Sequence, residues 1–190
     1  MKKFLFLLVT LMTFNCQGAL ISVTLDKSEY QLNETMTGKL VVSNFNELLG
    51  GFWSQLEFGS SALAITDWQF GDGFDDGLGS LQFAEHNVVG GNIYFSDYSD
   101  PFADTMTLTT NQGSEFVLAS FTAETLRLGQ HSLNLSDFGL LNFDNDFVDT
   151  EALNVSFEVS DIVRVPEPTS FLLATIFLLI LNCRKKLAGI

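Results

Sequence analysis

The chain has 190 residues, a net charge of −14 and a hydrophobic share of 46%, which is too apolar for an intrinsically disordered chain. Residues 20–164 hold 22 acidic side chains and only four basic ones. Such an acidic surface repels nucleic-acid phosphates, so nucleic acid is excluded as a partner. Both cysteines, Cys16 and Cys183, lie near the ends of the chain, so no disulfide framework is expected between them.

The first 19 residues have the three parts of a signal peptide. These are the basic start Lys2 and Lys3, the apolar run 4–14, and the small residues Gly18 and Ala19. A short uncharged run behind two lysines is typical of export, so we expect residues 1–19 to be removed. A lipoprotein modified at Cys16 and a buried helix of a globular domain both stay open as alternatives.

Alternation of apolar and polar residues dominates the segment from residue 20 to 163 and predicts β-strands. Turn residues such as Gly50-Gly51 and Gly90-Gly91 separate these runs at even spacing. The pattern predicts an all-β sandwich of about eight or nine strands over residues 20–164. We expect a long loop or a short extra element at 99–114. The expected strands are 20–25, 36–44, 51–59, 62–69, 80–86, 92–97, 115–123, 131–136 and 152–163.

Within the expected strands, the alternation also predicts which side chains are buried. Phe52, Leu56 and Phe58 should share one face of their strand, whereas Trp53 should point to the opposite side with polar neighbours. Two further buried faces are expected later in the chain. They are Val117, Ala119 and Phe121 in one strand, and Leu153, Val155, Phe157 and Val159 in another.

Nothing in the sequence indicates an enzyme. The body has only two histidines, His86 and His131, which we expect in exposed turns, and it has no Gly-x-Ser-x-Gly nucleophile motif. Two acidic loops, 71–77 and 142–149, leave a secreted glycoside hydrolase as an outlying alternative. A glycine-rich loop is a poor support for a carboxylate pair whose separation must be fixed, so we expect no catalysis.

The acidic loop 142–149 is a candidate calcium site. Oxygen ligands at alternate positions suit Ca²⁺, and the candidates here are Asn142, Asp144, Asp146 and Asp149. The loop lacks the central glycine and final glutamate of an EF-hand. A solvated acidic turn without a metal is the alternative interpretation.

Four aromatic side chains are candidate ligand contacts: Trp53, Trp68, Tyr94 and Tyr98. Exposed aromatic rings can stack on sugars or on a partner protein. The alternative is that they pack in the core or on a sheet face. Trp53 is the best candidate, because the alternation of its strand turns it away from the buried side.

The C-terminal segment has an unusual order of features. It begins with Val165, Pro166, Glu167 and Pro168, continues in an apolar stretch, and ends in Arg184, Lys185 and Lys186. A helix from about 169 to 183 would span roughly 22 Å, which is short of the ~30 Å hydrocarbon core but coverable by bilayer thinning. The positive-inside rule would place the basic cluster in the cytoplasm and the preceding domain outside.

This Val-Pro-Glu-Pro motif, apolar helix and basic cluster together resemble the PEP-CTERM sorting signal of Gram-negative bacteria. The resemblance covers residues 165–190 and departs from the usual pattern in Phe171 and Cys183. It implies processing near the Pro-Glu-Pro by an exosortase, a membrane protease, after tethering of the precursor in the inner membrane. It also implies display at the cell surface or release into the extracellular matrix, in association with exopolysaccharide.

The strand pattern between the two terminal segments is similar to that of cohesin-like domains. The similarity rests on the early strand Ile21–Leu25 and on Lys39–Val42 leading to Gly51–Phe58. It also rests on Phe116–Ala123 followed by Gly129 and Ser132–Leu135, and on the closing strand before the C-terminal segment. It implies a jelly-roll sandwich that binds another protein or a glycan without catalysis. A calcium-dependent carbohydrate-binding module is the alternative function.

Overall fold

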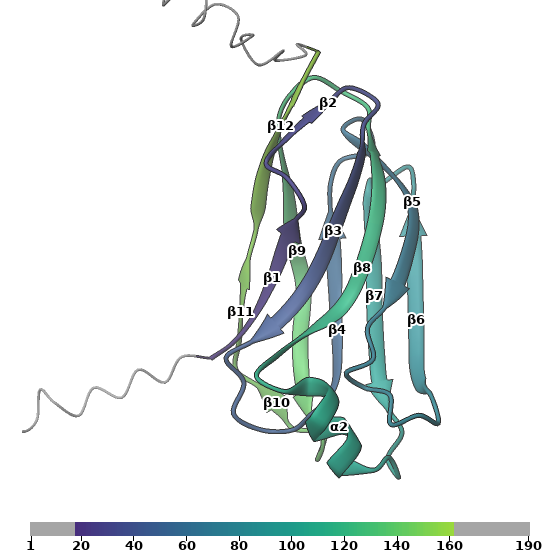
Figure 1. The fold of residues 1–190 in the computed structure, drawn as a ribbon, viewed down its shortest axis with the longest axis vertical. Helices are drawn as coiled ribbons and strands as arrows, with labels where there is room; N and C mark the ends of the chain where they lie inside the picture. The colour runs from purple at the N-terminus through teal and green to yellow at the C-terminus, as the bar shows by residue number, and fades with distance from the viewer. Residues whose placement is uncertain (1–17, 162–190) are drawn as a thin grey trace, which may run out of the picture. The chain divides into compact units, whose positions relative to one another are not determined.

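Twelve strands and one helix make up residues 18–161, the part of the chain that the computed structural model describes. The strands form two sheets that pack face to face (Figure 1). The elements are β1 (Ala19–Leu25), β2 (Glu29–Gln31), β3 (Thr35–Ser43), β4 (Leu49–Glu57), β5 (Leu63–Phe70), β6 (Ser80–Asn87), β7 (Asn92–Ser99), α2 (Thr105–Gln112), β8 (Glu115–Thr125), β9 (Gly129–Asn142), β10 (Phe147–Val148), β11 (Thr150–Leu153) and β12 (Val155–Ser160).

The two sheets have different strand orders. The five-stranded sheet runs β11-β1-β3-β8-β5, and the seven-stranded sheet runs β2-β12-β9-β4-β7-β6 with β10 paired to β9. Most neighbours are antiparallel, but β11 pairs with β1 and β12 pairs with β2 in parallel. An all-β sandwich is therefore confirmed, with more strands than the eight or nine predicted.

The core lies between the inner faces of the two sheets and is rich in phenylalanine. Phe52 and Phe95 from the seven-stranded sheet are fully buried, as is Phe121 from the five-stranded sheet. Phe74 stacks on Phe52 with ring centroids 5.8 Å apart, and Phe116 meets Phe74 edge-on at 5.4 Å. Each such ring pair adds about 0.5–1.5 kcal/mol beyond the burial of apolar area. Packing in the core thus accounts for seven of the phenylalanines in residues 18–161.

The helix α2 closes one end of the sandwich (Figure 1). Asp104 caps its first turn by accepting hydrogen bonds from the N–H groups of Met106 and Thr107, and Gly113 ends it with a positive φ of 54°. Leu108 and Gln112 are its buried residues. This helix is the short extra element that the sequence allowed between residues 99 and 114.

A bulge in β8 corrects the predicted burial of that strand. Leu40 of β3 pairs with Ala119 and the next residue, Val41, pairs with Val117, so Leu118 is skipped. The extra residue turns both Leu118 and Ala119 into the core, whereas Val117 is only half-buried. The prediction that Val117 shares the buried face of Ala119 was therefore wrong.

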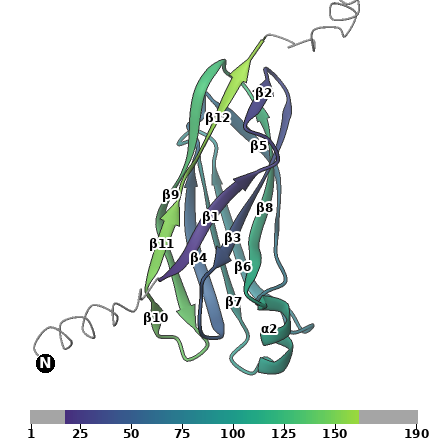
Figure 2. The same ribbon diagram turned by 60° about the vertical axis from the view of Figure 1, so that its left-hand side comes forward.

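The expected strand 152–163 is in fact two strands that belong to different sheets. β11 pairs with β1 of one sheet and β12 pairs with β9 of the other, and Figure 2 shows the two following one another along one edge. Asn154 lies between them. At this break the buried side changes from even-numbered to odd-numbered residues. Leu153 in β11 is therefore 54% exposed, whereas Phe157 and Val159 in β12 are buried as predicted.

Two predictions fall on residues that the structure does not describe. The predicted signal peptide lies before residue 18 except for its last two residues, and the whole of the predicted PEP-CTERM segment, 165–190, lies after residue 161. Within residues 18–161, no helix has the length and apolar character needed to cross a bilayer.

Candidate functional site

The outer face of the seven-stranded sheet carries a group of apolar and aromatic side chains, some exposed and some half-buried. Residues paired directly across neighbouring strands point to the same side of a sheet. Tyr98 pairs with both Leu81 and Gly51, and Trp53 pairs with Ser96, which in turn faces Phe83. The resulting set, called here the aromatic face, consists of Trp53, Leu81, Phe83, Tyr94, Tyr98 and Phe147.

Two glycines make the aromatic face flat. A Cβ built on Gly51 would lie 2.2 Å from the ring of Tyr98, and one built on Gly139 would lie 2.3 Å from the ring of Trp53. The ring of Tyr98 therefore lies over the backbone of Gly51, and the ring of Trp53 lies over the backbone of Gly139, each in a neighbouring strand. The rings of Trp53 and Phe147 are also nearly perpendicular, with centroids 5.9 Å apart, which extends the surface onto β10.

The aromatic face combines exposed apolar area with an acidic border. Phe83 is 54% exposed and Phe147 82%. Exposed apolar side chains that gather on one face mark an interaction surface, whereas scattered ones do not. Glu85 and Asp137 line a hollow of about 470 Å³ beside Tyr94. Partial burial raises the pKa of the Tyr94 hydroxyl, and the charge of Asp137 adds to that shift, so the phenol stays protonated. The surface offers ring faces and the hydroxyl donors of Tyr94 and Tyr98 to a ligand.

Three of the four predicted aromatic contacts lie in the aromatic face, and Trp68 does not. Trp68 belongs to the edge strand of the other sheet, where it packs edge-on against His86 at 5.9 Å. Leu81, Phe83 and Phe147 were missed by the sequence analysis. Leu81 and Phe83 alternate with Gln82 and Ala84, so the sequence correctly indicates that both lie on one face of the strand. The same pattern would predict that this apolar face is buried, whereas in the structure it is exposed.

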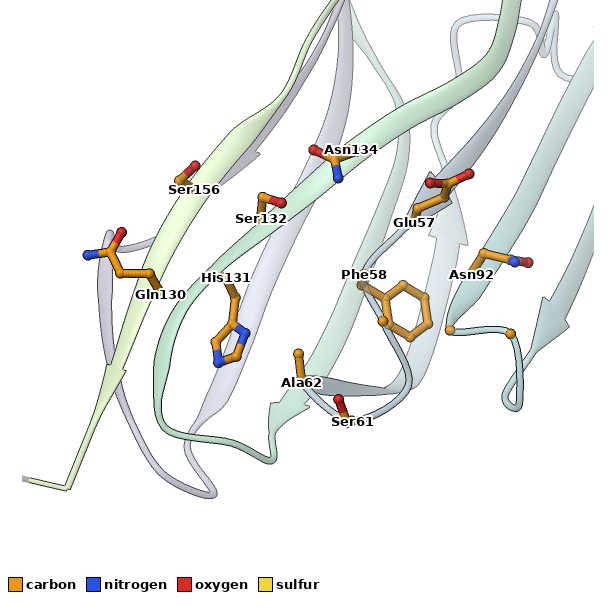
Figure 3. Close-up of a pocket in the computed structure, with 13 residues that line it drawn as sticks. Glu57, Phe58, Ser61, Ala62, Asn92, Gln130, His131, Ser132, Asn134 and Ser156 are labelled. Carbon is orange, nitrogen blue, oxygen red and sulfur yellow. The ribbon is translucent and has the colours of Figure 1, made fainter.

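A second feature is a wedge-shaped opening in the same sheet, of about 820 Å³ (Figure 3). It begins where β4 turns away from β9, just after the pair Glu57 and Asn134. Figure 3 shows the ring of His131 on one side and Phe58 and Ser61 on the other. The lining side chains are mostly hydroxyls and amides, and none of them is a lysine or an arginine.

The predicted calcium ligands do not form a compact cluster. Asn142 ends β9 and accepts a hydrogen bond from the N–H of Asp146 at 2.8 Å, while Asp144, Asp146 and Asp149 are exposed. Within residues 18–161, no three acidic, histidine or cysteine side chains are gathered so that they could hold a metal ion. In the other acidic loop, Asp75 accepts hydrogen bonds from the N–H groups of Gly77 and Gly79. That carboxylate stabilises its own loop.

Neither histidine is the exposed turn residue that was predicted. His86 lies in β6 and packs against Phe58 and Trp68. His131 lies in β9, where its ring contacts Phe157 at 5.6 Å and its Nε2 is 2.8 Å from the carbonyl oxygen of Arg127. Both rings pack against aromatic side chains of neighbouring elements and are therefore half-buried.

Comparison with solved structures identifies the fold. A type II cohesin domain from the cellulosome of Acetivibrio cellulolyticus matches with a TM-score of 0.64, at 15% identity over 74% of this chain and 95% of the other. The described part of the chain has the cohesin fold. A non-cellulosomal cohesin from the archaeon Archaeoglobus fulgidus has a TM-score of 0.58 at 14% identity, over 75% of this chain and 91% of the other.

A cohesin–dockerin complex from Clostridium thermocellum also matches, with a TM-score of 0.59 at 10% identity over 74% of this chain and 99% of the other. Identities this low establish the cohesin fold and no more. The chain matches no known family profile and no curated protein sequence. The resemblance inferred from the strand pattern is thus confirmed for the fold.

Proposed function

We propose that this protein is a non-catalytic, exported surface protein whose cohesin-fold domain binds a partner protein through the aromatic face. The observation that carries the proposal is the flat ring surface that the half-buried Trp53 and Tyr98 form with the exposed Leu81, Phe83 and Phe147 on one sheet. Exposed aromatic residues at the centre of a patch are the usual source of binding energy at protein interfaces. The known complexes of similar fold, in which cohesin holds a dockerin, support a protein partner.

Charge indicates what such a partner should look like. The body of the chain is strongly acidic, and Glu85 and Asp137 border the aromatic face. A partner with an apolar centre and a basic rim would complement this surface, and the charges would speed its association. A polysaccharide that stacks on the same rings is the second candidate, because the rings of Trp53 and Tyr98 lie over glycine backbone and are partly exposed.

The first prediction concerns the aromatic face. The double variant Trp53→Ala, Phe83→Ser should bind the partner at least ~30-fold more weakly, since the loss of a single hot-spot aromatic residue costs about 2 kcal/mol. The immobilised full chain and the variant are compared for retention of surface proteins from the native host and, separately, of its purified exopolysaccharide. The matched control is Leu153→Ser, which removes a 54% exposed apolar side chain from the other sheet.

A host protein held by the wild type and by the control, but lost with the double variant, is the expected result. Equal retention by wild type and double variant would contradict the proposal. Retention of polysaccharide alone, with loss in the double variant, would replace the protein partner by the glycan candidate.

The second prediction concerns sorting. We propose that residues 165–190 are a PEP-CTERM signal processed by an exosortase after export, on the grounds of Pro166, Glu167 and Pro168, the apolar stretch and the terminal basic cluster. A chain that ends at Arg164 should still be exported but should fail to localise at the cell surface. Fractionation of host cells, with mass spectrometry of the mature C-terminus, measures this. Unchanged localisation of the shortened chain, or a mature form that retains the tail, would refute it.

A further inference from the structure

The strand β9 has an edge that is paired on one side only. β12 pairs with β9 from Leu133 back to Gly129, while β4 pairs with β9 only as far as Asn134. After Glu57, the N–H groups of Phe58 and Gly59 donate instead to the carbonyl oxygen of Gly91. Within residues 18–161, no strand pairs with the β4-facing side of residues 129–133.

The wedge-shaped opening lies along this unpaired edge. It starts at the pair Glu57 and Asn134 and is closed at its far end, where Leu126 N–H donates to the carbonyl oxygen of Ala62 at 2.8 Å. The unpaired stretch of five residues is about 16 Å long at the usual rise of a strand. Figure 3 shows the opening between β9 and the turn that contains Ser61 and Ala62.

The two sides of the opening have different chemistry. On the inner side lie Phe58 and Ala62, which are 5% and 6% exposed, together with the ring of His131. On the outer side lie Ser132, Asn134 and the carboxylate of Glu57. Glu57 accepts hydrogen bonds from Ser136 and Gln55, which hold the carboxylate in place at the mouth of the opening.

Unpaired backbone groups along a strand edge form main-chain hydrogen bonds with an added strand. We propose that the wedge binds an extended peptide segment of a partner protein, three or four residues long, which pairs with the free edge of β9. Alternation within the added strand places a small apolar side chain inward over Phe58 and His131. The next side chain then points outward, where a lysine or arginine meets Glu57. This site is distinct from the aromatic face.

A sugar ligand fits the wedge less well. Sugar sites rely on an exposed aromatic platform, and the only phenylalanine in the lining, Phe58, is 5% exposed. The half-buried ring of His131 packs on Phe157. The strand edge, by contrast, offers a row of backbone donors and acceptors at the spacing that a peptide needs.

The test uses the full chain and a fluorescently labelled, end-capped hexapeptide of alternating lysine and valine. The control peptide has the same charge but proline in place of valine, which removes half of its N–H donors. Anisotropy should show binding of the first peptide only. Backbone hydrogen exchange should slow by about tenfold at residues 129–133 and stay unchanged along β6, the edge strand of the same sheet.

Four variants locate the contact. Ser61→Trp fills the opening and should abolish binding, whereas the adjacent Ser60→Trp, outside the lining, should not. Glu57→Gln should weaken binding about fivefold, as expected for one exposed ion pair. The aromatic-face variant Phe83→Ser should bind the peptide normally, which separates this site from the proposed partner surface.

The proposal would be overturned if the proline peptide bound equally well, or if exchange slowed in β6 and not in β9. It would also be overturned if host polysaccharide, and not the peptide, protected residues 129–133. Exchange on the wild-type chain decides the matter even if Ser61→Trp does not fold.

Discussion

Replacing Gln112 with alanine should lower the free energy of unfolding by about 3–5 kcal/mol, because it leaves several buried polar groups without partners. Gln112 is 1% exposed at the end of α2. Its Oε1 accepts a hydrogen bond from Leu49 N–H at 2.9 Å, and its Nε2 donates to the carbonyl oxygens of Leu49 at 2.7 Å and Gly73 at 3.0 Å. One side chain thus fastens the helix to β4 and to the loop after β5.

Urea denaturation of the wild type and three variants tests this role. Gln112→Met keeps most of the side-chain volume but loses the hydrogen bonds, so it should be nearly as destabilised as Gln112→Ala. Thr110→Ala, on the exposed side of the same helix, should change stability by less than about 1 kcal/mol. If Gln112→Met is as stable as the wild type, packing and not hydrogen bonding holds the helix in place.

Replacing Asp97 with asparagine should stabilise the protein at pH 8 by about 2–3 kcal/mol, since the charge of the buried carboxylate is then removed. Asp97 is 0% exposed on the inner face of β7, and neither oxygen accepts a hydrogen bond of normal geometry from the described residues. Burial raises the pKa of Asp97 from its ordinary value of 3.8 to about 6. The nearby Ser80 side chain and the N–H of Tyr98 favour the charged carboxylate and so lower the pKa in part.

The pH dependence follows from the direction of this shift. The folded state binds the proton more tightly than the unfolded state, so protonation of Asp97 favours folding. The loss of stability caused by the charged Asp97 carboxylate is fully present above the folded pKa of about 6, and it disappears as the pH falls below 3.8. The advantage of Asp97→Asn should therefore shrink between pH 8 and pH 4, in contrast to any effect of packing alone.

Thermal and urea denaturation at pH 8 and pH 4 measure both parts of the prediction. The matched control is Asp144→Asn, an exposed carboxylate in a turn, which should change stability little at either pH. A variant Asp97→Asn that is less stable than the wild type at pH 8 would contradict the account. It would mean that the native carboxylate is compensated by a partner group.

The alternation of the sequence located most strands because it reports a local property, the side of the chain that meets solvent. Ile21 and Val23 in β1, and Phe52 and Leu56 in β4, are buried as their spacing predicts. The same reasoning did not predict that residues 105–112 form the helix α2. Only Leu108 and Gln112 of its eight residues are buried, and its threonines are weak helix formers, so no apolar stripe marks it.

The candidate site was only half visible for a related reason. Trp53 could be found because it stands opposite buried phenylalanine in its own strand. Phe83 could not, because its strand lies at a sheet edge where the apolar side faces outward. Nothing in a single strand tells which of its faces the second sheet will cover.

The sequence by itself determined that the body is an acidic, cysteine-free β-sandwich, because composition and period-two spacing depend on neighbours along the chain. It did not determine where the chain changes sheets after Leu153, where β4 leaves β9, or how Gly51 and Gly139 come to lie under aromatic rings. The tertiary structure decided these features, because each depends on which strands become neighbours. That choice rests on contacts between residues far apart in sequence, and those contacts create both candidate binding surfaces.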